Sequence, residues 1–298
     1  MVSKPATLAE NAIDTPWNTV SRLQALKSAG IQTIIRYYNK ANSSTLPEKK
    51  LSPHEALAIS AAGFDIAVVY QDRQRLIGDF GFDNGRASGE RAARYALEEI
   101  GQPFGSAIYF AADYDAVKAN ELKAIEEYFK GVRDAFYALG VGTEYGIGAY
   151  GSGHVLSALK KSGGADYFWL AMSKGWKGYK DFLDSGDWHI LQNKETKIGG
   201  LDLDTNETNP SHASFGAFRI DGPAVDTDWI AGGNDYAVIA RGGLNLRGGP
   251  GTEFPAKELL PESTIVSVLK MYGDWAMVDL GGDGQADGYC FAAYLEPV

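Results

Sequence analysis

Short apolar runs alternate with longer segments of helical period along the first two thirds of the chain. The apolar runs predict strands at 11–14, 32–38, 65–70, 106–113, 144–150, 167–172, 187–192 and 199–204. Between them, residues 121–139 place apolar side chains at intervals of three and four, which is typical of a helix with one buried face. Ser52 and Pro53 predict another helix start, with Glu55 completing a capping box. Strands that alternate with helices predict an α/β fold, and eight strands are enough to close a TIM-like (β/α) barrel.

The pattern changes after Phe218. The last three predicted barrel strands already have little helix between them, and residues 221–234 have no apolar periodicity. Beyond them, 236–241, 264–271 and 274–280 are β-rich runs separated by glycine turns, as in small all-β domains. We therefore predict a barrel at 1–220, a linker at 221–234 and a small all-β domain at 235–298.

The composition of this 298-residue chain limits the classes of partner and cofactor that it can be expected to bind. Its net charge of −10 disfavours nucleic acid and anionic membranes. The single cysteine, Cys290, excludes an internal disulfide framework, and the four histidines have no metal-ligand spacing, so we expect neither metal nor other cofactor. We find neither a signal-peptide core nor a membrane-spanning run. The expectation is a monomer that stays in the cytoplasm or leaves by a signal-independent route to act on the cell wall.

Aspartates follow several of the predicted strands, at Asp14, Asp113, Asp115, Asp202 and Asp204. The carboxyl ends of parallel barrel strands meet on one face, so these side chains are expected to converge there. Because side chains alternate along a strand, residues 113 and 115 should point to the same side. Paired carboxylates without a Ser or Cys nucleophile motif favour acid/base chemistry on a glycosidic bond. The alternative for any single aspartate is a turn or a helix cap.

Aromatic and polar residues near the same strand ends are candidates for substrate binding. Tyr70, Tyr150 and Trp169 are predicted to line a cleft, where flat rings suit sugar faces; the alternative is that they fill the barrel core. Arg36 is predicted to contact substrate or to form a structural salt bridge, and Gln192 to bind sugar or the barrel rim.

Motifs in the first part resemble the glycoside-hydrolase-like domain known as domain of unknown function 1906. Eight short motifs occur along about residues 12–218 in the same order as in that family: IDTPW, IIRYY, DIAVVYQD, AIYFAADYD, YGIGAYGSGHVL, YFWLAM, WHILQN and GGLDLDTN. The family is related in pattern to family 25 glycoside hydrolases, the peptidoglycan-cleaving lysozymes of bacteria and phages. The resemblance implies a TIM-like barrel with fewer helices in its last third.

The same resemblance implies roles for the aspartates. Asp14 matches the lysozyme aspartate that ends the first strand, Asp113 and Asp115 match the Asp-x-Glu pair, and Asp202 matches the final-strand aspartate, with Asp204 just beyond. Asp115 would be the general acid/base, although the lysozymes have Glu there. Asp113 would orient an acetamido group or stabilise oxocarbenium charge. Asp14 and Asp202 would tune pKa values and hold hydroxyls, and Asp204 would contact substrate or cap a turn.

The C-terminal part resembles bacterial SH3-like domains over about residues 235–298. This resemblance is carried by LNLRGGPGTEFP, TIVSVLKMYGDWAMVDL and GYCFAAYL. The glycine-rich run is not a phosphate loop, because it lacks the Lys-Ser/Thr ending and no helix follows. The resemblance implies a module that binds cell-wall peptide or another extended peptide.

Together these features predict a lysozyme-like glycosidase that acts on cell-wall glycan, with peptidoglycan as the expected substrate, targeted by an SH3-like module. The competing hypothesis is a catalytically weak or inactive glycan-binding protein. The replacement of Glu by Asp115 favours that alternative.

Overall fold

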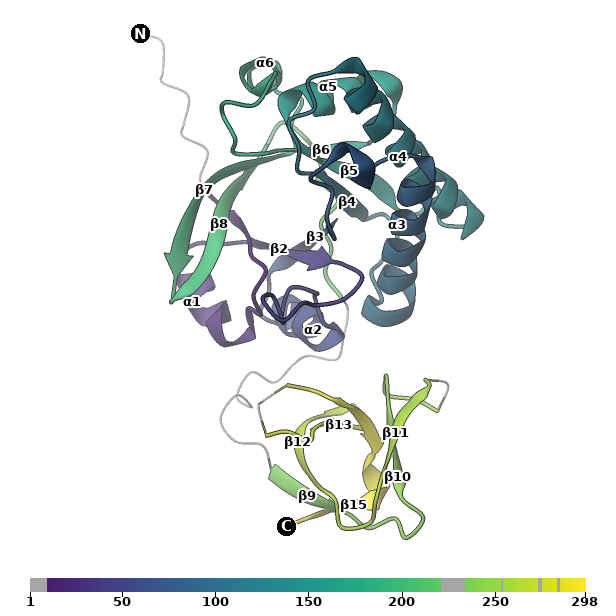
Figure 1. The fold of residues 1–298 in the computed structure, drawn as a ribbon. Coiled ribbons are helices and arrows are strands. Elements are labelled where there is room, and N and C mark those ends of the chain that lie inside the picture. The colour runs from purple at the N-terminus through teal and green to yellow at the C-terminus, as the bar shows by residue number, and fades with distance from the viewer. Residues whose placement is uncertain (1–9, 221–233, 253, 273–274, 283–284) are drawn as a thin grey trace. The chain divides into compact units, whose positions relative to one another are not determined.

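In the part of the chain that the structure describes, eight strands close into a barrel in chain order (Figure 1). This computed structural model describes residues 10–220, 234–252, 254–272, 275–282 and 285–298. The barrel strands are β1 (Ala12–Asp14), β2 (Thr33–Tyr38), β3 (Asp65–Tyr70), β4 (Ala107–Ala112), β5 (Gly146–Gly151), β6 (Tyr167–Leu170), β7 (Ile190–Ile198) and β8 (Leu201–Thr208). The predicted TIM-like barrel is therefore confirmed.

The last strand departs from the all-parallel arrangement that the sequence predicted. Strands β1 to β7 pair in parallel, whereas β8 is antiparallel to both β7 and β1. The cause is the two-residue turn at Gly199 and Gly200, whose φ values of 58° and 85° suit a tight hairpin. Because β8 runs in reverse, its beginning lies where the other strands end. Asp204 is consequently paired with Asp14.

Helices cover the outside of the barrel. They are α1 (Leu23–Ser28), α2 (Pro53–Ala61), α3 (Phe82–Arg94), α4 (Ala119–Ala138), α5 (Gly153–Ser162) and α6 (Tyr179–Ser185), with short 3₁₀ turns at Val20–Arg22 and Ile77–Asp79 and a π turn at Tyr95–Ile100. The main core lies between strands and helices, and includes Ile34, Phe110 and Phe129. A second cluster, including Ile35, Tyr109 and Trp169, takes alternate residues of β2 to β7 and fills the barrel interior.

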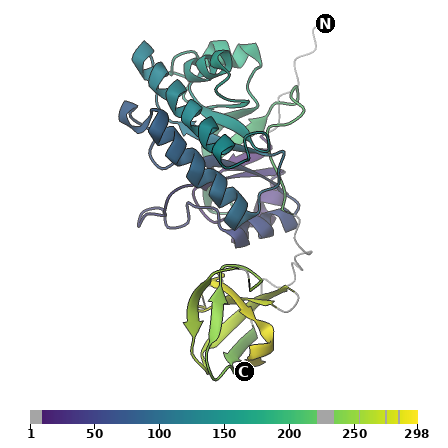
Figure 2. The same ribbon diagram turned by 90° about the vertical axis from the view of Figure 1, so that its right-hand side faces the viewer.

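Helices α3 and α4 lie side by side, as Figure 2 shows, and their backbones touch. A Cβ atom added at Gly131 would lie 2.1 Å from the Phe82 carbonyl oxygen. Gly131→Ala is therefore expected to lower the free energy of unfolding by about 1–3 kcal/mol, although alanine favours a helix. Chemical denaturation measures this. The control is Gly175→Ala, where nothing lies within 4 Å of the added atom and no loss is expected; equal effects in both would contradict the packing argument.

The start of α2 confirms one half of the predicted capping box and corrects the other. Ser52 caps the helix, because its hydroxyl accepts from the Glu55 amide at 3.1 Å. The Glu55 carboxylate does not return to the cap. It is buried against the guanidinium of Arg36, with Arg36 Nε 2.9 Å from Glu55 Oε1. It also accepts from the amide and hydroxyl of Thr19 at 2.8 and 2.9 Å.

The C-terminal unit is built from β strands. The described residues of Gly222–Val298 form a sheet of seven strands in the order β11-β10-β14-β13-β12-β9-β15. These are β9 (Asn234–Val238), β10 (Leu244–Arg247), β11 (Ala256–Leu260), β12 (Ile265–Tyr272), β13 (Trp275–Asp279), β14 (Gly288–Phe291) and β15 (Leu295–Pro297), with a 3₁₀ turn at Ala292–Tyr294. The core includes Val266, Val278 and Cys290. This agrees with the predicted SH3-like class. Apart from Asn234, the predicted linker lies outside the described residues.

None of the described helices is both long and apolar enough to span a membrane.

Candidate active site at the mouth of the barrel

A layer of polar side chains occupies the end of the barrel where β1 to β7 finish and β8 begins. Alternate residues point inward along each strand, so the last inward position on several strands carries a polar group. These groups are Asp14 on β1, Tyr37 on β2, Tyr150 on β5, Gln192 on β7, and Asp204 and Asn206 on β8. We call these six residues the carboxyl cluster.

Asp14 is the centre of the carboxyl cluster. Its side chain accepts hydrogen bonds from the Tyr37 hydroxyl at 2.9 Å, Gln192 Nε2 at 3.1 Å and Asn206 Nδ2 at 2.8 Å. The residue is only 2% exposed. Burial raises the pKa of Asp14, and the three hydrogen bonds act in the opposite direction because they favour the carboxylate.

Asp204 lies beside Asp14 and is more open to solvent. Gln192 Nε2 donates to Asp204 Oδ2 at 3.0 Å as well as to Asp14, so one amide nitrogen bridges the two carboxyl groups. Burial raises the pKa of Asp204 to about 7, assisted by the negative charges of Asp14 and Glu195. A carboxyl group with this pKa still holds a proton near neutral pH, as a general acid requires.

The bridging amide is held in one orientation. Gln192 Oε1 accepts from the Tyr150 hydroxyl at 3.0 Å and from the Met172 amide at 3.4 Å, which directs Nε2 toward the carboxyl groups. Asn206 is fixed in the same way, because its Oδ1 accepts from Trp169 Nε1 at 2.9 Å. The barrel interior therefore supports the two aspartates with neutral donors rather than with cations.

Asp113 lies at the edge of this cluster. It follows β4, and its Oδ2 is 3.3 Å from both Gln71 Nε2 and Arg75 Nε. Burial, followed by the charges of Asp113, Asp14 and Asp204, raises the pKa of the Tyr150 hydroxyl well above its usual value. The charges of Asp113, Asp14 and Asp204 all raise the pKa of the same hydroxyl group. Asp113 is therefore close enough to the Asp14–Asp204 pair to contribute to the same electrostatic environment.

The structure does not bring Asp115 into the carboxyl cluster. Strand β4 ends at Ala112, so residues 113–115 do not follow the alternation of a strand, and the period-two argument for 113 and 115 is wrong. Asp115 Oδ1 instead accepts from the Lys177 amide at 3.0 Å, in the segment before α6. Its charge acts on His154 at the start of α5.

Asp202 also lies apart from the cluster. It stands near the tip of the β7–β8 hairpin, where its carboxylate pairs with Lys197 Nζ at 3.0 Å. Its side chain is 62% exposed. The sequence placed Asp202 and Asp204 at the end of a parallel strand; reversal of β8 makes Asp204, not Asp202, the partner of Asp14.

The predicted binding residues fall into two groups: some point into the barrel, and others point outward to the helices. Tyr150 and Gln192 belong to the carboxyl cluster, and Trp169 lies beneath it in the filled interior. Tyr70 points to the helix layer, where it packs on Phe110, so the cleft-lining prediction is wrong for this residue. Arg36 is also on the outer side and fully buried, which excludes direct contact with substrate.

Tyr37, Asn206 and Gln71 were missed as site residues. Tyr37 lies two residues after Ile35 on β2, and both side chains point into the barrel. Alternation along the predicted strand therefore places these two side chains on the same side. Asn206 has none without the hairpin register, and Gln71 lies just beyond the end of β3. Among the described residues, no group of three or more His, Cys, Asp or Glu side chains could hold a metal ion.

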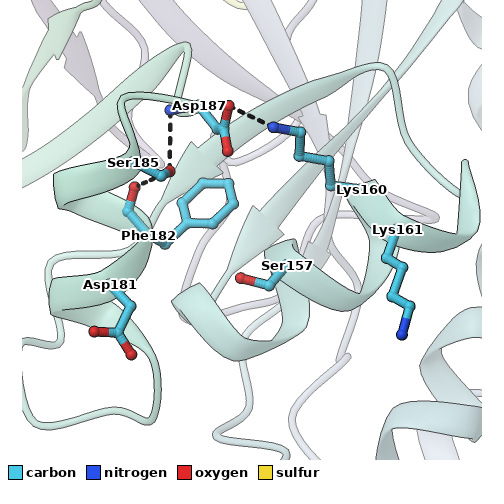
Figure 3. Close-up of a pocket in the computed structure, with 7 residues that line it drawn as sticks. All are labelled: Ser157, Lys160, Lys161, Asp181, Phe182, Ser185 and Asp187. Atoms are coloured by element: carbon cyan, nitrogen blue, oxygen red, sulfur yellow. Dashed lines mark hydrogen bonds and ion pairs between the residues drawn. The ribbon is translucent and has the colours of Figure 1, made fainter.

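A separate hollow of about 380 Å³ lies on the helical side of the domain, between α5 and α6 (Figure 3). Lys160 and Asp187 form an ion pair in its lining, which also includes Phe182 and Lys161. Its lining shares no residue with the carboxyl cluster.

The fold and the carboxyl cluster define a TIM-like barrel of the glycoside hydrolase-like class. The chain belongs to the Rv2525c-like, glycoside hydrolase-like domain family, whose profile matches residues 24–222, more than half of the chain. A bacterial SH3 domain profile matches residues 242–296. Both resemblances identified in the sequence are thereby confirmed.

Two proteins of Bacillus subtilis (strain 168) are similar to the barrel part. Uncharacterized protein YbfG is 31% identical over 208 residues, which is 66% of this chain and 28% of YbfG. Uncharacterized protein FadG is 30% identical over 182 residues, which is 61% of this chain and 31% of FadG. The chain thus spans less than a third of the length of either relative.

Among solved structures, the Mycobacterium tuberculosis Tat-secreted protein Rv2525c in complex with L-tartrate is similar in fold. It superposes with a TM-score of 0.57 at 21% identity, over 69% of this chain and 97% of that chain. An uncharacterized B. stearothermophilus protein superposes with a TM-score of 0.50 at 15% identity, over 67% of this chain and 96% of that chain. These similarities concern the barrel fold.

Proposed function

We propose that the barrel hydrolyses a glycosidic bond of bacterial cell-wall glycan, with peptidoglycan as the substrate, and that the SH3 domain binds the wall. The observation that carries this proposal is the Asp14–Asp204 pair bridged by Gln192, in which Asp204 has a pKa of about 7. Two carboxyl groups of unlike environment are what acid-catalysed glycoside cleavage needs.

In this proposal Asp204 donates its proton to the leaving glycosidic oxygen as the bond to the anomeric carbon breaks. Water then adds to that carbon and gives one proton to the Asp204 carboxylate, so the products are two sugar hydroxyls and the acid is regenerated. Asp113, partly exposed at the edge of the cluster, orients an acetamido group or stabilises the oxocarbenium charge. Asp14 is too buried to reach a sugar, and its role is to raise the pKa of Asp204 by its charge. Asp115, the donor implied by the lysozyme resemblance, is the alternative acid.

A glycan-binding protein with weak or no catalysis is the second candidate. Two observations favour it: the Asp14 carboxyl is saturated by protein donors, and Asp115 is engaged by the Lys177 amide. Incubation of the full chain with purified peptidoglycan, followed by mass spectrometry and a reducing-end assay, separates the two. Wall binding with no new reducing ends would reject the hydrolase.

The rate of reducing-end release is expected to fall as the pH rises through about 7. The carboxyl of Asp204 is protonated below this pKa and can donate; above it the group is a carboxylate and cannot. Initial rates measured from acidic to mildly alkaline pH test this. A rate that stays constant or rises through neutral pH would show that Asp204 is not the donor.

A further inference from the structure

Lys49 lies at the mouth of the barrel, beside the carboxyl cluster. It belongs to the segment between β2 and α2, and its Nζ donates to the backbone oxygen of Gln71 at 2.8 Å and to Gln71 Oε1 at 3.2 Å. The ammonium also lies 4.8 Å from the centre of the Tyr37 ring. Since the Tyr37 hydroxyl donates to Asp14, one aromatic ring separates this cation from the centre of the cluster.

Arg75, in the segment between β3 and α3, supplies a second cation to the same mouth. Its Nε lies 3.3 Å from Asp113 Oδ2, and that oxygen also accepts from Gln71 Nε2. Gln71 therefore lies between the two cations. Its side-chain oxygen accepts from Lys49, and its side-chain nitrogen donates to Asp113, which pairs with Arg75. The Arg75 side chain is 71% exposed, so most of its guanidinium faces solvent.

Lys49 has no carboxylate partner at ion-pair distance within the described part of the chain. Among the residues that the structure describes, its contacts are with Gln71 and the Tyr37 ring, and none of the ion pairs involves it. Burial, together with the nearby charge of Arg75, lowers the pKa of Lys49 to about 8, and the carboxylates of Asp72 and Asp113 act in the opposite direction. A half-buried ammonium of this kind is stabilised when an anion binds.

An anionic glycan would otherwise be repelled here. The chain carries a net charge of −10, and Asp14, Asp113 and Asp204 lie at or beside the mouth. Two cations at the mouth, Lys49 held by Gln71 and Arg75 paired with Asp113, are the arrangement that lets a carboxylate approach such a cluster. An ammonium and an exposed guanidinium supply donors that match carboxylate oxygens.

We propose that Lys49 and Arg75 form a carboxylate-binding subsite, and that the barrel therefore selects a carboxylate-bearing glycan over a neutral one. The identity of the glycan rests on the proposed function, but the inference concerns binding and not turnover. The carboxylate comes either from the lactyl ether of a muramic sugar or from a stem peptide attached to it.

The test is a calorimetric titration of the full chain with three ligands. These are peptide-free alternating N-acetylglucosamine–N-acetylmuramic acid strands, the same strands carrying stem peptides, and neutral N-acetylglucosamine oligomers of equal length. Wild type is expected to bind at least one acidic ligand about tenfold more tightly than the neutral oligomer. Preference for peptide-free strands identifies the lactyl carboxylate, and preference for peptide-bearing strands identifies the stem peptide.

Lys49→Gln and Arg75→Gln are each expected to weaken binding of the acidic ligands more than binding of the neutral oligomer, which removes most of this preference. The matched control is Lys50→Gln, which removes the same charge one residue away. Lys50 Nζ lies 3.6 Å from the centre of the Tyr95 ring, and its substitution should leave the preference intact. Arg75 is exposed, so its variant tests the subsite even if Lys49→Gln disturbs folding.

Equal affinity of wild type for acidic and neutral ligands would overturn the inference, as would no binding of either acidic strand. Equal losses in the Lys49 and Lys50 variants would also overturn it, because the effect would then be one of overall charge. A reducing-end assay on the same samples keeps the two proposals apart. Lys49-dependent binding without cleavage supports the subsite and rejects the hydrolase, whereas equal cleavage of acidic and neutral strands does the reverse.

Discussion

Asp204→Asn is expected to lower the rate of the proposed peptidoglycan hydrolysis by about 10²–10⁴-fold, the usual cost of losing general acid help. Asparagine keeps the size of the side chain and can still bond to Gln192, but it has no proton to give to the leaving oxygen. Because the partly exposed Asp204 shares the Gln192 amide with the buried Asp14, it is the member of the pair that can both hold a proton and reach a sugar. Initial rates of reducing-end release measure the loss.

Asp202→Asn is the matched control for this variant. Asp202 is the same residue type two positions earlier on the same strand and is paired with Lys197 in solvent, so its substitution should leave the rate near wild type. Asp115→Asn separates the two candidate donors. If it abolishes turnover while Asp204→Asn does not, the donor is Asp115, and the role assigned to the Gln192-bridged pair is wrong.

The fold could be predicted from the sequence because each strand is a short apolar run that local pattern reveals. Residues 65–70 and 167–170 are strands in the structure, within predicted runs of the same or similar extent. The reversal of β8 was not predicted. The polar residues 193–197 do not look like a strand, although they belong to the second half of β7. The turn at Gly199 and Gly200 was therefore interpreted as a loop before a new parallel strand.

The site was only partly predictable, because it depends on which side of the wall each residue faces. Tyr70 and Tyr150 both lie near strand ends, yet Tyr150 is inward and Tyr70 outward. Within one strand, the direction of a side chain follows from its spacing to a residue known to point inward, because directions alternate. Between strands, the direction can be assigned only when the register of their pairing is known. The pairing of Asp14 with Asp204 joins the first and the last strand of the barrel sequence, and no local pattern carries that information. Lys49 lies in a connecting segment without periodicity.

Arg36 links the stability of the barrel to the position of the site. It was a candidate substrate contact, but its guanidinium donates to the Thr15 carbonyl, the residue after Asp14, and to the Glu48 carbonyl, the residue before Lys49. With its ion pair to Glu55, this buried group ties the end of β1 to the segment that carries the proposed subsite. Arg36 is therefore a positioning residue.

Arg36→Met is expected to lower the free energy of unfolding by about 3–5 kcal/mol, because it leaves the Glu55 carboxylate buried without its counter-ion. Urea unfolding followed by the helical circular dichroism signal measures this for the barrel, since α1 to α6 all belong to that unit. The matched control is Arg219→Met, which breaks an ion pair with Asp65 whose partners are 50% and 41% exposed. That change should cost no more than about 1 kcal/mol.

The double variant Arg36→Met/Glu55→Met gives the sharper result. If the loss in Arg36→Met comes from an uncompensated buried charge, removal of Glu55 as well should restore much of the stability, since two apolar side chains replace two paired charges. The Thr15 and Glu48 carbonyls would lack their donor in both variants, so we expect Lys49 to be displaced and the preference for acidic over neutral glycan to be weak in both. A double variant as unstable as Arg36→Met would mean that the carbonyl contacts, and not the ion pair, hold this side of the barrel together.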